Sequence, residues 1–103
     1  MRTAKTSELI GDALGWAVKM AEGEGGVHHA AGADHSISWE KAGAIIERER
    51  IELRYIGGEG WEATCHGERY ISVERGATPL IAAMRCYVTH NLDEEIEIPE
   101  ELA

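Results

Sequence analysis

The chain is 103 residues long and has a formal net charge of −9, from 10 lysines and arginines against 19 aspartates and glutamates. This length corresponds to one domain, taken here as 1–103, with a modest core. The acidic balance argues against sequence-independent binding of DNA or RNA, which needs clustered Lys and Arg. No apolar run reaches membrane-spanning length, and no secretory leader is visible, so we expect the protein to stay in the cytoplasm where it is made.

The first helix is predicted from residue 6 to residue 21 by apolar residues at helical spacing. Thr6 or Ser7 is suited to cap it. Gly11 and Gly15 weaken the helix but let another backbone come close. We expect a homo-oligomer, because it would share arginines across an interface, and Gly11 and Gly15 could permit close helix contact there.

A Gly- and Ala-rich loop is predicted over residues 22–37. It carries His28, His29, Asp34 and His35, which are residue types that bind zinc. Adjacent histidines do not easily hold one ion together, and no rigid helix spaces them, so we assign no metal site. A loop this long in a small domain is either mobile or functional, and the sequence leaves both interpretations open.

The second helix begins at Ser36 or Ser38, either of which can cap it, and runs to Glu49. One face of this helix holds Trp39, Ala42 and Ile46. Its end carries a charge run over residues 47–50, which is typical of a solvated helix face.

Three strands are predicted next, over residues 51–55, 61–65 and 70–74, because apolar and polar residues alternate in each. Glycine-containing turns separate them. In the third strand, Ile71 and Val73 share one face. The pattern indicates an antiparallel meander with one apolar face.

A last helix begins at Thr78, a good N-cap, followed by Pro79 at the first helical position. Its apolar residues surround the helix, which is typical of a helix buried on more than one side. Arg85 is the only charge between Pro79 and Thr89. It is either a solvated arginine on a core helix or a reader of carboxylate or phosphate in a pocket.

An acidic tail over residues 93–103 ends the chain. Ile96 and Ile98 alternate with glutamates there, so a short C-terminal edge strand before Pro99 is an option. The fold class is therefore α+β: a three-stranded antiparallel sheet packed with about three helices, in the order α-α-β-β-β-α.

No catalytic or cofactor-binding motif is visible. There is no nucleophile elbow, no phosphate-cradling glycine loop and no clear acid/base pair of carboxylates. Cys65 and Cys86 have no metal-binding spacing and are expected to be free thiols. We therefore expect a protein that is not an enzyme and that needs no cofactor.

Arginine, aromatic and hydroxyl side chains are the groups that nucleotide binding requires. Three arginines could converge where the second helix, the first strand and the last helix pack together. The candidate ligand-binding residues are Ser36, Ser38, Trp39, Arg48, Arg54, Tyr70, Thr78 and Arg85. The alternative is that these arginines belong to solvated faces.

Three stretches, residues 6–18, 39–53 and 77–88, resemble the NinX-like proteins of tailed bacteriophages and prophages. The order of elements also looks like the broader phage ABA-sandwich domains, and the acidic ending with Pro99 is similar to the family's tail. The resemblance covers nearly the whole chain and implies a phage accessory protein in the cytoplasm of the infected host. It brings no catalytic residues. Three positions depart from the family pattern: His35-Ser36 instead of Tyr-Ser, Ser38 instead of Asp before Trp39, and Ala42-Gly43-Ala44 instead of Gly-Gly-Pro.

Our leading hypothesis from the sequence is a sponge that sequesters a small nucleotide-like ligand, such as an immune second messenger, without catalysis. The negative charge counts against it, because an anionic ligand needs a locally positive pocket. The alternative is an acidic inhibitor that binds a host defence protein or CRISPR complex. A third interpretation is a hydrolase acting on a nucleotide.

Overall fold

The computed structural model describes residues 1–23 and 35–102. It confirms an α+β fold with the predicted order of three helices and a three-stranded antiparallel sheet. The helices are α1 (Gly11–Ala21), α2 (Trp39–Glu49) and α3 (Pro79–Asn91), with short 3₁₀ turns η1 (Thr6–Glu8), η2 (Gly57–Glu59) and η3 (Glu100–Leu102). The strands are β1 (Arg2–Lys5), β2 (Glu52–Tyr55), β3 (Trp61–His66), β4 (Ile71–Gly76) and β5 (Glu95–Ile98).

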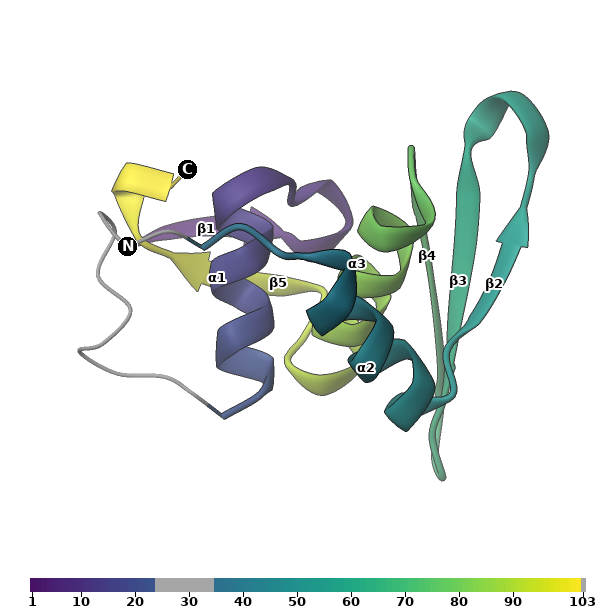
Figure 1. Cartoon of the computed structure of the whole chain (residues 1–103). Coiled ribbons are helices and arrows are strands. Elements are labelled where there is room, and N and C mark those ends of the chain that lie inside the picture. The colour runs from purple at the N-terminus through teal and green to yellow at the C-terminus, as the bar shows by residue number, and fades with distance from the viewer. Residues whose placement is uncertain (24–34, 103) are drawn as a thin grey trace.

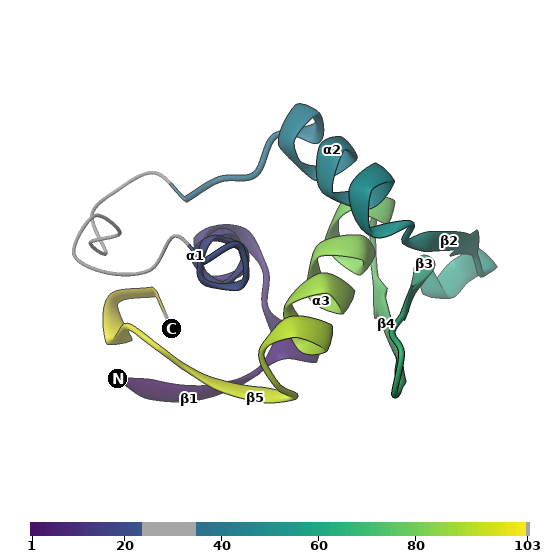
Figure 2. The same cartoon turned by 90° about the horizontal axis from the view of Figure 1, so that it is seen from below.

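Helix α3 lies at the centre of the molecule (Figures 1 and 2). The β2-β3-β4 sheet lies on one side of it, and α1 lies with the β1-β5 pair on the other. All three helices lie on the same side of the β2-β3-β4 sheet, and its opposite face is uncovered (Figure 1). The core is therefore the layer around α3.

The sequence signals of α3 are confirmed. Thr78 caps the helix by accepting a hydrogen bond from the backbone N–H of Ile81 at 3.1 Å, and Pro79 occupies the first turn. Six of its residues are buried: Ala82, Ala83, Met84, Cys86, Tyr87 and Val88. Among the described residues, no helix is both long and apolar enough to cross a membrane.

Helix α2 is capped by Ser38, whose Oγ accepts from the backbone N–H of Lys41 at 3.1 Å. Its buried residues are Ala42 and Ile45. Trp39, which by its spacing shares a face with Ala42, is 54% exposed, whereas Ala42 is fully buried. Trp39 is the first helical residue, and the buried stripe begins one turn later.

The beginning of the chain differs from the prediction. Residues 2–5 form β1, which pairs with β5, and α1 begins only at Gly11 with no side-chain cap. The predicted cap by Thr6 or Ser7 is wrong, because Thr6 is fully buried and its hydroxyl bonds to Thr89 instead. Tertiary hydrogen bonds hold this segment as the separate turn η1.

The predicted close backbone approach in α1 occurs at Gly15, within the chain. A Cβ on Gly15 would lie 1.4 Å from the carbonyl oxygen of His35, so only glycine fits there. His35 itself is fully buried, and its Nδ1 lies 3.1 Å from Nζ of Lys19. The chain's own backbone fills this place, so the predicted contact between copies is wrong at Gly15. Association of copies through another surface stays a prediction.

The antiparallel meander is confirmed, with Thr64 opposite Val73 and Cys65 opposite Ser72. This register turns Ser72 toward α3 and leaves Ile71 and Val73 on the uncovered face, 60% and 50% exposed. Because residues directly opposite share a face, and Cys65 faces the core, Ser72 must face it too.

The polar residues that face α3 find hydrogen-bond partners on that helix. Ser72 Oγ lies 2.9 Å from Nδ1 of His90, and Cys86 Sγ donates to the Ser72 carbonyl at 3.1 Å. Ile71 and Val73 share one face, as predicted, but it is the uncovered face, so the apolar residues of β4 do not join the buried face of the meander. The two cysteines are free, as expected, and the structure buries both of them.

The predicted C-terminal strand exists as β5. It pairs with β1 in a separate two-stranded sheet and does not extend the meander. Within the described residues, β4 therefore has no neighbouring strand on the side away from β3.

Candidate functional site: a groove along the free edge of β4

Three hollows lie side by side along the free edge of β4, and Glu74 lines all three. The largest, of about 810 Å³, lies under the glycine turn at residues 57–60. The second, of about 410 Å³, lies between β4 and the end of α3. The third, of about 230 Å³, lies against η1. We call the three together the edge groove; its residues are Lys5–Ser7, Tyr55, Gly57–Gly60, Glu62, Tyr70–Ala77, Arg85, Thr89 and Leu92–Glu95.

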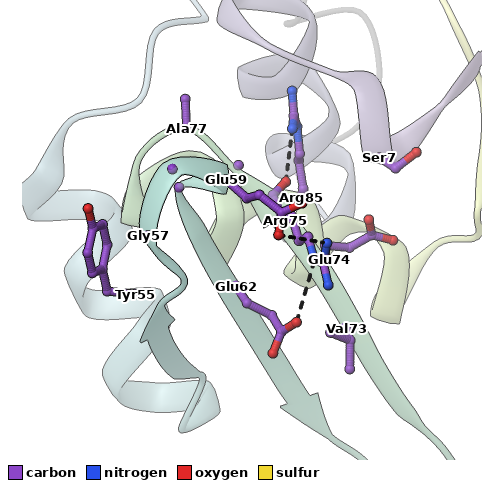
Figure 3. Close-up of a pocket in the computed structure, with 13 residues that line it drawn as sticks. Ser7, Tyr55, Gly57, Glu59, Glu62, Val73, Glu74, Arg75, Ala77 and Arg85 are labelled. Atoms are coloured by element: carbon purple, nitrogen blue, oxygen red, sulfur yellow. Dashed lines mark hydrogen bonds and ion pairs between the residues drawn. The ribbon is translucent and has the colours of Figure 1, made fainter.

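Arg85 forms one bridge across the floor of the edge groove. Its Nε donates to the carbonyl of Leu9 at 2.8 Å, and its Nη1 donates to the carbonyl of Arg75 at 2.9 Å. The side chain therefore ties the segment after η1 to β4. Figure 3 shows Arg85 and Arg75 on the wall of the largest hollow. Burial lowers the pKa of Arg85, and the nearby Glu74 opposes that shift.

A second bridge runs from Thr6 to β4. The hydroxyls of Thr6 and Thr89 lie 2.7 Å apart, and Thr89 Oγ1 donates to Glu74 Oε2 at 3.2 Å. Thr6 also donates from its backbone N–H and its hydroxyl to the carbonyl of Glu94. These bonds hold both walls of the edge groove against α3, so the groove is a built feature of the fold.

Glu74 is a partly buried carboxyl group of the edge groove with a shifted pKa. Burial raises its pKa, and the negative charge of Glu94 adds to that effect. The hydrogen bond from Thr89 and the charge of Arg85 act in the opposite direction. A cation brought to Glu74 would stabilise its ionised form.

The other charges of the largest hollow are paired. Arg75 lies 3.5 Å from Glu62 and 3.7 Å from Glu59 (Figure 3). Glu62 also accepts a hydrogen bond from Arg54 at 2.8 Å. Two arginines face three carboxylates in this hollow. The hollow is therefore not a strongly positive site.

The predicted site residues lie in separate places. Arg48 belongs to a cluster at the ends of α1 and α2, where its Nη2 donates to Glu22 and to the Tyr87 hydroxyl, both at 3.0 Å. Tyr87 in turn donates to Glu22 at 2.9 Å. Burial and the bond to Glu22 raise the pKa of Tyr87 to about 12. Arg48 thus joins three helices.

Other predicted residues have local partners or face solvent. Ser38 and Thr78 are helix caps, Ser36 is exposed, and Arg54 pairs with Glu62 on the uncovered sheet face. The predicted residues on the edge groove are Tyr70, whose hydroxyl donates to the carbonyl of His90 at 2.6 Å, and Arg85. The contacts of Arg48, Arg54 and Arg85 do not join these arginines to one another.

Four residues that line the edge groove were not predicted from the sequence as site residues, namely Ser7, Glu74, Thr89 and Glu94. The alternation of polar and apolar residues in β4 gave a partial indication, since it places Ser72 and Glu74 on one face of the strand and Ile71 and Val73 on the other. It did not say which set faces the helices.

Residue types that bind zinc occur in the sequence over residues 22–37. His28, His29 and Asp34 lie outside the described residues. Over residues 1–23 and 35–102, no three His, Cys, Asp or Glu side chains gather in a way that could hold an ion.

Comparison with known protein families finds a match for this chain. The family model described as Bacteriophage P22, NinX matches residues 27–91, which is more than half of the chain. No curated protein matches the sequence. The matched region includes α2, the β2-β3-β4 sheet and α3, and therefore contains the whole of β4. The chain therefore belongs to the NinX family of phage accessory proteins.

Proposed function

We propose that this chain is a non-catalytic phage protein that binds a basic surface of a host protein through the edge groove, and thereby inhibits a host defence complex in the cytoplasm. The observation that carries the proposal is the charge of the edge groove. Glu74, Asp93, Glu94 and Glu95 lie along its second and third hollows, where Lys5 is the one lysine or arginine among the lining residues.

The whole-chain charge supports the same assignment. A net charge of −9 attracts a basic partner and speeds encounter with it. The two arginines at the groove, Arg75 and Arg85, already bond to carboxylates or backbone carbonyls. An anionic partner would have to compete for them.

Capture of the partner tests the proposal. Tagged protein is expressed in host bacteria, cross-linked and purified, and the wild type is compared with a Glu94→Lys, Glu95→Lys double variant. We expect a host protein with a basic surface that the wild type retains at low salt and loses at high salt. The double variant should lose it. Equal capture by both proteins, or no partner at low salt, contradicts the proposal.

A small nucleotide-like ligand is the second candidate partner, and one observation favours it. The largest hollow has a volume in the range of ligand pockets, and it is lined by Arg85, Ser7 and the backbone of a glycine turn. In this sponge function, the ligand would be sequestered and released intact.

Thermal shift with cyclic di- and trinucleotides, cyclic ADP-ribose isomers and ordinary nucleotides tests this candidate. A ligand at about 100 times its Kd should stabilise the fold by about 2.7 kcal/mol. Arg85→Lys keeps the charge but loses the planar fork, so it should weaken a genuine hit. Recovery of intact ligand indicates a sponge, whereas turnover indicates a nucleotide hydrolase. A flat panel contradicts both.

A further inference from the structure

The free edge of β4 presents unpaired backbone groups to the edge groove. The backbone N–H of Gly67 donates to the carbonyl of Tyr70 at 3.0 Å, so these two residues form a hydrogen-bonded pair of the hairpin. Bonded and non-bonded pairs alternate along an antiparallel ladder. Ser72 and Glu74 therefore bond to β3, and Ile71, Val73 and Arg75 direct their backbone groups outward.

One outward group already has a partner. The carbonyl of Arg75 accepts from Arg85, which confirms the outward direction of this residue. No backbone hydrogen bond from the described residues reaches Ile71 or Val73 on that side. Both residues line the second hollow of the edge groove, which leaves space beside this edge.

The two sides of an added strand would meet different chemistry. On the uncovered sheet face, its side chains would lie beside Ile71 and Val73, which are apolar. On the α3 side they would lie beside Ser72 and Glu74 and reach the carboxylates at residues 93–95. The edge therefore suits a strand with apolar side chains on one face and basic side chains on the other.

We propose that β4 accepts an extended peptide segment of the partner as a fourth strand, with alternating apolar and basic side chains. Backbone hydrogen bonds to Ile71 and Val73 supply affinity, and the alternating side chains supply specificity. This inference rests on the proposed function and names how the partner docks. Six residues of β4 allow a segment of about six to eight residues at about 3.3 Å each.

Charge argues for a basic segment over a second copy of this chain. Pairing β4 with β4 of another copy would bring two chains of net charge −9 together. It would also place Glu94 and Glu95 of each groove near the carboxylates of the other copy. Like charges so arranged oppose association.

Amide hydrogen exchange on the full chain tests the strand directly. The probe is a blocked synthetic peptide of about seven residues in which valine and lysine alternate. Strand addition should slow exchange at the amides of Ile71 and Val73, while those of Ser72 and Glu74, already bonded to β3, change little. Binding without this alternating pattern overturns the proposal.

Two control peptides separate backbone pairing from charge attraction. A peptide with glutamate in place of lysine should not bind, because it meets the groove carboxylates. A valine–lysine peptide N-methylated at alternate residues keeps the charge but loses donors, so it should bind at least ten-fold more weakly. Equal binding of the methylated and unmethylated peptides would show a charge contact only.

Two variants of the chain locate the contact. Val73→Pro removes an outward N–H that the β3 ladder does not use, and proline is tolerated at such edge positions; it should abolish peptide binding. Glu94→Gln should weaken binding about two- to five-fold, as expected for a partly exposed ion pair. Glu47→Gln makes the same change on an exposed residue of α2, away from the groove, and should have no effect.

The outcomes distinguish this inference from the proposed function. A host protein captured through Glu94 and Glu95, with no exchange pattern from the peptide, leaves the function standing and overturns strand addition. Failure of both experiments overturns both. Protection at Ile71 and Val73 without peptide, together with a dimeric mass, would show that a second copy occupies the edge. If Val73→Pro does not fold, the exchange pattern of the wild type still decides.

Discussion

Replacing Arg85 with methionine tests whether this residue is a structural bridge. Methionine keeps most of the apolar stem and removes the guanidinium that bonds to the carbonyls of Leu9 and Arg75. A hydrogen bond from a charged donor contributes about 1.5–3 kcal/mol. Two such bonds would set an upper value of about 6 kcal/mol.

Two structural facts reduce this value. Arg85 is half-buried, so water can replace part of each lost bond. Burial also lowers the pKa of Arg85, which means that the guanidinium is desolvated at some cost. We therefore expect Arg85→Met to lower the free energy of unfolding by about 2 kcal/mol. For a domain of this size that corresponds to a fall in Tm of about 8–16 °C.

Urea unfolding measures the effect, since the midpoint reports stability and the slope reports the surface exposed. Arg54→Met is the matched control, because the Arg54 side chain is 72% exposed and bonds to one carboxylate, that of Glu62. Its loss should cost less than about 0.5 kcal/mol. Arg85→Lys keeps the charge and can reach one carbonyl, so it should fall between the two. Equal stability of Arg85→Met and Arg54→Met would refute the bridge.

Three further predictions concern the core and the titrating groups. Gly15→Ala should destabilise the fold by more than about 2 kcal/mol in urea unfolding, because the added Cβ would overlap the His35 carbonyl. A Cβ on Gly43 would have nothing within 4 Å, so the control variant Gly43→Ala should instead stabilise the fold by about 0.5–1 kcal/mol. Equal effects of the two variants would contradict the close approach at Gly15. Burial raises the folded pKa of Glu74 above its unfolded value, so the protonated side chain favours folding at low pH, and this contribution is lost as pH rises through the folded pKa. The neutral variant Glu74→Gln should therefore gain stability relative to the wild type from pH 4 to pH 7. A difference in unfolding free energy that stays constant over this range would contradict the pKa shift. In an ultraviolet titration of the folded protein, one tyrosine should ionise near pH 12, and Tyr87→Phe should remove that step; a step that persists belongs to another tyrosine.

Local signals in the sequence determined most of the secondary structure. Ser38 and Thr78 begin α2 and α3 because their hydroxyls satisfy free N–H groups of the first helical turn, a requirement that depends only on nearby residues. The alternation and the glycine turns likewise located the three strands of the meander. The family resemblance also came from the sequence alone, and the family match confirms it.

Only the tertiary structure decided which groups lie together. The alternation of β4 is the same whichever face is buried, and the register with Cys65 and Ala63 turned Ser72 and Glu74 inward. Thr6 left its predicted capping position because a partner 83 residues away, Thr89, offers it a hydrogen bond in the interior. The helical pattern of the sequence predicts that Arg85 lies on α3. Only the tertiary structure brings the carbonyls of Leu9 and Arg75 within reach, so that Arg85 links the segment after η1 to β4. The edge groove exists because those long-range bonds hold η1 and β4 in fixed positions against α3. No local pattern in the sequence encodes this arrangement of distant segments.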